Sequence, residues 1–194
     1  MYLRTPDNHE IRILHGTEND WEDAMALAWR TFSRFTAPLY PKEGCESFID
    51  FISSQMLKRM FLIGRYRLYV AKDGEKIVGL LGFRENNHIS LLFTDAEYHG
   101  CGIGRALVTC AEDYLFERDE LPLDNEAEKI LDLLYERGDG HFMTVFAAPN
   151  AVDFYKKLGF VQFADEGVAD GISYIPMRKG EKQHEDPVLR SEGL

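Results

Sequence analysis

The segment that most constrains this chain is a glycine-rich run, His99-Gly100-Cys101-Gly102-Ile103-Gly104-Arg105-Ala106. Its three alternating glycines follow an apolar, strand-like stretch at 89–93 and open an amphipathic stretch. The first turn of a helix carries unpaired N–H groups and the positive end of the helix dipole. Glycines have no Cβ, so an anionic group can come close to those N–H groups. This order of elements predicts a phosphate site for a nucleotide or for a cofactor with a pyrophosphate.

Spacing excludes two well-known phosphate motifs. A P-loop has Lys and then Ser or Thr directly after its last glycine, but Arg105 and Ala106 stand there. A dinucleotide fingerprint has glycine at its first, third and sixth places, and Arg105 is sixth when counting starts at Gly100. Two interpretations remain: a glycine-rich phosphate turn, or a tight turn in which the glycines only satisfy backbone angles.

A second informative segment covers 148–160, Ala-Pro-Asn-Ala-Val-Asp-Phe-Tyr-Lys-Lys-Leu-Gly-Phe. Its apolar residues recur at helical intervals, and Gly159 is a typical stop for a short helix. The two segments together resemble the GNAT superfamily of acyl-CoA-dependent N-acetyltransferases. The glycine run is similar to that family's pyrophosphate loop, Gln/Arg-x-x-Gly-x-Gly/Ala, and the second segment to its Ala-x-x-Phe-Tyr-x-Lys-Leu-Gly-Phe helix. Residues 171–177 also resemble a closing strand found in one bacterial branch.

The resemblance covers roughly residues 10 to 179 and implies a fold. This is the α/β (α+β) GNAT-like acyl-CoA N-acyltransferase fold, a mixed, bent sheet of six or seven strands flanked by helices. We expect a single domain over 1–179 and a polar, flexible tail over 180–194.

The apolar pattern agrees with such a fold. Alternation predicts strands at 10–14, 66–70, 77–83, 89–94 and 141–147, with closing strands near 161 and 172. Asp73-Gly74 between apolar runs predicts a hairpin. Helices are expected after an N-cap at Thr17, around 48–56, after the glycines, and around 124–137 as an extra element. That extra helix could pack on the sheet or form the surface of a homodimer.

The resemblance also implies which residues bind acetyl-CoA. The backbone of Leu92, Phe93 and Thr94 would pair with the pantetheine arm like an added strand. The pyrophosphate would be wrapped by His99, Gly100, Cys101, Gly102, Ile103, Gly104 and Arg105. His99 replaces the family's usual Gln or Arg, so any charge there depends on pH. Ala148 stands where many relatives carry Asn or Ser, and Asn150 is the neighbour that could compensate.

Tyr155 matches the family tyrosine that acts as general acid near the cofactor sulfur, although a tyrosine here could also simply pack beside Phe154. No general base is assigned: Glu85, His88, Asp95, Glu97 and a water chain all remain open. Phe35, Tyr40 and Phe48 could line an acceptor pocket or pack in the core. The histidines and cysteines lack metal-ligand spacing, so no metal site is expected.

Composition limits the partners. A net charge of -11 argues against nucleic acid; it reflects either solubility or attraction of a cationic acceptor. No apolar run reaches the ~20 residues of a membrane helix, the N-terminus lacks an apolar signal core, and the three cysteines fit no disulfide framework. We therefore expect a cytoplasmic protein without membrane partners.

The resemblance implies an enzyme, an acetyl-CoA-dependent N-acetyltransferase. It would transfer acetyl directly from the CoA thioester to a primary amine of a small molecule or of a protein. A related acyl group or a hydroxyl acceptor stays open. The alternative is a protein that is not an enzyme: a non-catalytic acetyl-CoA-binding sensor or structural protein.

Overall fold

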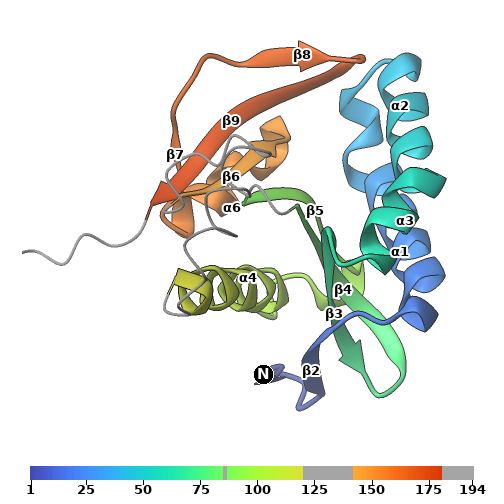
Figure 1. The fold of residues 1–194 in the computed structure, drawn as a ribbon, viewed down its shortest axis with the longest axis vertical. Coiled ribbons are helices and arrows are strands. Elements are labelled where there is room, and N and C mark those ends of the chain that lie inside the picture. The colour runs from blue at the N-terminus through green and yellow to red at the C-terminus, as the bar shows by residue number, and fades with distance from the viewer. Residues whose placement is uncertain (85–86, 120–141, 181–194) are drawn as a thin grey trace, which may run out of the picture.

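Apolar runs bounded by tight turns form the centre of the molecule as an antiparallel meander. The computed structural model describes residues 1–84, 87–119 and 142–180 (Figure 1). In this part of the chain nine strands form a sheet in the order β1-β2-β3-β4-β5-β6-β9-β7, with β8 beside β9. The strands are β1 (Tyr2–Arg4), β2 (Glu10–His15), β3 (Tyr66–Asp73), β4 (Lys76–Arg84), β5 (His88–Thr94), β6 (Phe142–Ala147), β7 (Val161–Gln162), β8 (Gly167–Ala169) and β9 (Ile172–Gly180).

The sequence predicts seven of these strands and misses β1 and β8. Both are only three residues long. Such short edge strands are too brief for an alternating pattern to stand out. All pairs are antiparallel except β5 with β6.

Helices cover both faces of the sheet. Figure 1 places α1, α2 and α3 on one side of the central strands and α4 on the other. Each side has its own hydrophobic core: one joins the first three helices to β3 and β4, and the other joins α4 and α6 to β2–β6. The helices are α1 (Trp21–Phe35), α2 (Lys42–Ile52), α3 (Gln55–Leu62), α4 (Ile103–Asp119) and α6 (Val152–Lys157), with short 3-10 turns at Glu18–Asp20, Ala37–Leu39, Ala96–Tyr98 and Pro149–Ala151.

The helix expected around 48–56 is two helices. The hydroxyl of Ser54 accepts a hydrogen bond from the Leu57 amide at 3.3 Å and begins α3 as its N-cap. An N-cap residue has extended backbone angles, so the chain cannot continue α2 through this point. The predicted helix at 124–137 and residues 181–194 of the predicted tail lie outside the described residues.

The sheet opens between β5 and β6. The two strands pair only at His88 with Thr144 and at Ile89 with Val145, and they diverge beyond those residues. The backbone of β5 from Leu91 onward therefore has β4 on one side and no strand on the other. The candidate site lies where these two strands diverge.

Candidate active site

A cavity of about 860 Å³ lies where β5 and β6 separate. Its walls come from β5, the glycine-rich run (the glycine loop, 99–105), β6, α6 and the ends of α1 and α2. The cavity is lined by Tyr155, the predicted general acid, and by most residues predicted to hold the donor: Leu92, Phe93, Thr94, His99, Gly100, Gly102, Ile103, Gly104, Arg105 and Asn150. Cys101 does not line it; its side chain packs against the core behind the loop.

The glycine loop presents free backbone N–H groups. Gly100 and Gly102 have φ of 79° and 82°, angles that L side chains rarely adopt. The first helical bond of α4 runs from the Ala106 amide to the Gly102 carbonyl at 3.0 Å. Within the described part of the chain, no carbonyl accepts from the amides of residues 102–105. These four N–H groups and the helix dipole make this end of the cavity suitable for an anion.

Gly104 has a different role from the other two glycines. A Cβ at this position would lie 3.1 Å from the Phe154 ring of α6. The missing side chain therefore lets α6 pack directly against the first turn of α4. This contact brings the Phe-Tyr helix to the cavity, which the two sequence motifs alone could not reveal.

Tyr155 lies in the cavity wall with its ring buried between two phenylalanines. The ring centroids of Phe154 and Phe160 are 5.2 Å and 5.3 Å away, both edge-on. Burial raises the pKa of the Tyr155 phenol, so it stays protonated at neutral pH. No described residue hydrogen-bonds its hydroxyl. The Tyr155 ring therefore packs in the core and also lines the cavity, and its role as general acid stays a prediction.

A β-bulge at Ser90 shapes the floor of the cavity. Leu91 pairs with Gly82 and Ile89 with Phe83, which leaves Ser90 as an extra residue in β5. The Ser90 hydroxyl lies 2.9 Å from the buried Tyr66 hydroxyl of β3. The Tyr66 oxygen occupies the space where a Cβ of Gly82 would stand, 1.9 Å away. No local sequence pattern predicted this bulge, and Gly82 inside an apolar strand was the one signal that could have indicated it.

His99 is turned back toward its own loop. Its Nε2 lies 3.0 Å from the Thr94 carbonyl oxygen, and its ring centroid lies 5.0 Å from that of Phe35 at the end of α1. A carbonyl only accepts, so Nε2 carries the hydrogen. The histidine thus holds the end of β5 against the glycine loop.

Asn150 and Ala148 both line the cavity beside the end of α1. The Asn150 Nδ2 donates to the Phe35 carbonyl at 3.1 Å. This leaves the Oδ1 acceptor of Asn150 as the group available to a ligand. Its role in binding the donor stays a prediction.

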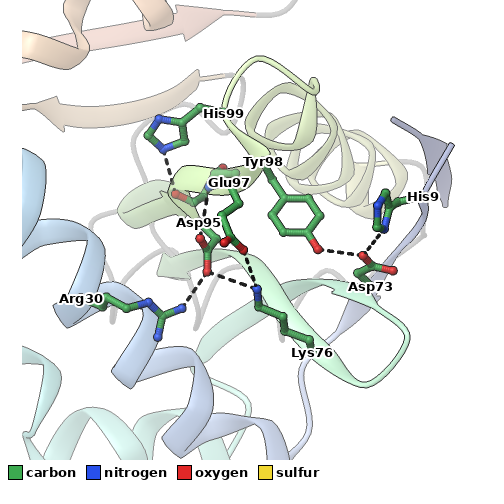
Figure 2. A network of polar contacts seen from close by, with 9 residues as sticks. His9, Arg30, Asp73, Lys76, Asp95, Glu97, Tyr98 and His99 are labelled. Atoms are coloured by element: carbon green, nitrogen blue, oxygen red, sulfur yellow. Dashed lines mark hydrogen bonds and ion pairs between the residues drawn. The ribbon is translucent and has the colours of Figure 1, made fainter. Parts of the chain in front are cut away.

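Charged residues fix the turn at 95–98, which precedes the glycine loop (Figure 2). The Asp95 carboxylate accepts from Arg30 at 2.8 Å and from the Glu97 amide at 3.3 Å. Burial alone would raise the pKa of Asp95, but these two bonds and the nearby Lys76 charge lower it overall. Asp95 therefore stays ionised and joins α1 to the turn that follows β5.

A second set of contacts also holds the turn before the glycine loop. The Tyr98 hydroxyl donates to the Asp73 carboxylate at 2.7 Å, which also lies 2.6 Å from the His9 Nδ1 (Figure 2). The hydrogen bond to Asp73 raises the pKa of Tyr98 to about 12. Both networks rest on partners 21 to 65 positions apart in the chain, which is why no sequence pattern predicted them.

Among the described residues, no side chain left open as the general base lines the cavity. The described cavity lining contains no Asp or Glu. Asp95 is engaged by Arg30, and Glu97 contacts Lys76 at 3.1 Å. His88 lies outside the lining; burial and the Arg84 charge lower its pKa to about 4, so it is neutral at pH 7. Glu85 lies outside the described residues.

Two further properties of the described residues limit the site. They contain no group of three His, Cys, Asp or Glu that could hold a metal ion. No helix among them has the length and apolar character needed to cross a membrane.

Comparison with known families identifies the family of this chain. The model of the acetyltransferase (GNAT) domain family matches residues 36–137 and 124–181. The chain belongs to this family. It is therefore an enzyme of the N-acetyltransferase type, and GNAT enzymes in general take the acyl group from an acyl-CoA. No curated protein matches this chain.

Solved structures agree with the GNAT fold. The chain is similar to a GCN5-related N-acetyltransferase from Rhodopseudomonas palustris, with 20% identity, 93% of this chain and 99% of that chain covered, and a TM-score of 0.68. It is also similar to the PaiA N-acetyltransferase of Thermoplasma acidophilum, solved with coenzyme A, with 20% identity, 88% and 99% covered, and a TM-score of 0.62. The apo form of YjaB from Escherichia coli gives 23% identity, 87% and 96% covered, and a TM-score of 0.56. At this identity the likeness shows the fold, and it confirms the fold class expected from the sequence.

Proposed function

We propose that this GNAT enzyme transfers an acetyl group from acetyl-CoA directly to a primary amine of a small molecule or of a protein. One observation carries the proposal: the free amides at the start of α4, the end of β5 that has no strand on its β6 side, and Tyr155 all line one cavity. Acetyl-CoA presents a diphosphate, an extended arm with two amides, and a thioester. The cavity offers a partner for each of these three parts.

The diphosphate end would be held by backbone and charge together. The amides of Gly102, Ile103 and Gly104 supply donors at a helix start, and Arg105 adds a positive charge on the same turn. The PaiA structure from T. acidophilum contains coenzyme A, which supports a CoA site in this fold.

The pantetheine arm would continue the sheet. Because β5 has no neighbouring strand on its β6 side beyond Ile89, the backbone of Leu92, Phe93 and Thr94 can pair on that side with the amides of an extended ligand. The Thr94 carbonyl already accepts from His99, so we expect Leu92 and Phe93 to supply most of these bonds. The Oδ1 of Asn150 would add an acceptor that the Ala148 side chain lacks.

The transfer forms a bond between the amine nitrogen and the acetyl carbon, and it breaks the bond between that carbon and the sulfur. The leaving sulfur accepts the hydrogen of the Tyr155 phenol, which burial keeps protonated, and water then restores that proton. The amine loses its proton to water, since the described lining has no carboxylate. Orientation of the two substrates would supply much of the rate.

Thermal unfolding with increasing acetyl-CoA tests the binding half of the proposal. A ligand that binds only the folded state raises the midpoint as its concentration rises. Gly102→Asp would remove this rise, because it places a carboxylate against the anion site. Gly64→Asp is the matched control: Gly64 also has a positive φ, 79°, it has open space around it, and it is remote from the cavity. Equal responses of both variants would refute the site.

Release of free CoA with a panel of amines tests the chemical half. Turnover with an amine supports the transferase. A protein whose midpoint rises with acetyl-CoA but which releases no CoA with any amine would instead fit the sensor role.

A further inference from the structure

Aromatic rings make up much of the cavity wall. The first wall belongs to α1, α2, the segment between them and β5. Its members are Phe32, Phe35, Tyr40, Phe48, Phe51 and Phe93. Phe32 and Phe48 stack with centroids 3.8 Å apart and planes 12° apart, and Phe93 meets Phe48 edge-on at 5.7 Å. Rings locked together in this way form a rigid apolar surface.

The second wall is carried by β6. Phe146 lines the cavity although 53% of its surface is exposed. One of its faces is stacked on Tyr174 of β9, with centroids 4.5 Å apart, and the His88 ring lies 4.8 Å away. The exposed part of the Phe146 ring is available to an apolar part of a ligand.

The charges in the cavity have one sign. Arg105 and Lys157 line it, and the described lining residues include no carboxylate. An acceptor with several positive charges would therefore lose water here without gaining a negative partner. The stacked faces of Phe32 and Phe48 cover each other, so they are closed to a cation–π contact. The net charge of the chain is -11, but the described cavity lining contains basic side chains and no carboxylate.

We propose that the acceptor is a monoamine carried on an aromatic body, and that polyamines are poor acceptors. This inference rests on the proposed function and names its substrate class. The aromatic body would lie between the α1–α2 wall and Phe146, and the amine would point to the mouth of the β5–β6 gap near Tyr155. Removal of water by the apolar walls lowers the pKa of an amine, which favours the neutral nucleophile without a carboxylate base.

Free-CoA release with three amines tests the proposal: 2-phenylethylamine, butylamine and spermidine. We expect kcat/KM for 2-phenylethylamine to exceed that for spermidine by about a hundredfold. Phe146→Ala should lower kcat/KM for 2-phenylethylamine about tenfold, through KM, and change butylamine and the KM of acetyl-CoA little. Phe163→Ala, an equal truncation at an exposed ring outside the cavity, should change nothing. If Phe146→Ala fails to fold, Phe51→Ala removes another ring of the cavity wall and should give the same pattern across the three amines.

Two results would overturn the proposal: spermidine as the better acceptor, or an equal loss for all three amines in Phe146→Ala. If no amine releases CoA, the proposed function fails separately. The substrate class is then decided by calorimetric binding of the same amines to the protein in the presence of CoA. Binding of 2-phenylethylamine supports the class, and binding of spermidine alone, or of neither amine, refutes it.

Discussion

The guanidinium of Arg30 lies 2.8 Å from the carboxylate of Asp95, and this pair joins helix α1 to the turn that precedes the glycine loop. Arg30 is more than half exposed, whereas Asp95 is 10% exposed. The same carboxylate accepts the Glu97 amide at the start of that turn. One buried charge thus connects α1, which carries part of the proposed acceptor wall, to the proposed donor site.

Replacement of Asp95 by Asn should weaken both fold and donor binding. The amide cannot match the charge-assisted bond to Arg30, so we expect a loss of about 1–3 kcal/mol of unfolding free energy. The KM of acetyl-CoA should rise, because the turn before the glycine loop loses its anchor. Urea unfolding and initial rates measure the two effects. Glu97→Gln is the control, since Glu97 is 75% exposed and should change stability by less than about 0.5 kcal/mol.

Gly82→Ala should be among the most destabilising single substitutions in β4. Its Cβ would lie 1.9 Å from the Tyr66 hydroxyl and 2.8 Å from the ring carbon that carries it. We expect a loss of about 3 kcal/mol in urea unfolding, the upper range for overpacking. Tyr66→Phe in the same chain should recover part of this loss by removing the nearer atom. A double variant no more stable than Gly82→Ala would show that the clash is elsewhere.

The His88 ring should make stability depend on pH. Its folded pKa of about 4 lies below the unfolded value of 6.5, so the unfolded state binds more protons between these values. Its contribution to stability is therefore full above pH 6.5 and is lost as pH falls toward 4. One titrating group with this shift loses about 2 kcal/mol between pH 7 and pH 5.

His88→Gln tests this directly, because glutamine does not titrate. Urea unfolding at pH 7 and pH 5 should show a smaller pH-dependent loss in the variant, by about 2 kcal/mol. His15, whose pKa burial and Arg67 also lower, accounts for part of the remaining slope. An unchanged pH dependence in the variant would contradict the neutral, buried state of His88.

Local patterns in the sequence predicted the parts of the site that are local. The glycine loop, the hairpin at Asp73-Gly74 and the helix stop at Gly159 depend on backbone angles that few residues other than glycine favour, and all three occur as expected. The strand and helix order followed from apolar periodicity in the same way. The GNAT family was recognisable from two short segments for this reason.

The rest depends on contacts that no local pattern encodes. The bulge at Ser90 follows from the Tyr66 hydroxyl, 24 positions away, and the Arg30–Asp95 pair spans 65 positions. Phe35, Tyr40 and Phe48 were ambiguous in the sequence, because an aromatic ring that lines a cavity and one that fills a core obey the same helical spacing. In the structure all three rings line the cavity, and Phe48 belongs to the hydrophobic core as well.

Tyr155→Phe provides the sharpest test of the proposed chemistry. The change removes one oxygen and keeps the ring between Phe154 and Phe160. We expect kcat to fall by about 10²–10⁴-fold, with little change in the KM of acetyl-CoA, because the phenol acts on the leaving sulfur. Stability should not fall, since no described residue hydrogen-bonds this hydroxyl.

Tyr69→Phe is the matched control. Tyr69 is also buried, its hydroxyl has no hydrogen-bond partner among the described residues, and it does not line the cavity. Removing an unpaired buried hydroxyl should leave kcat unchanged and raise the unfolding midpoint slightly. If Tyr69→Phe lost as much kcat as Tyr155→Phe, the loss in Tyr155→Phe would reflect a change in the core. It would then not reflect the removal of a proton donor from the reacting sulfur. Full activity in Tyr155→Phe would assign the proton at the sulfur to water.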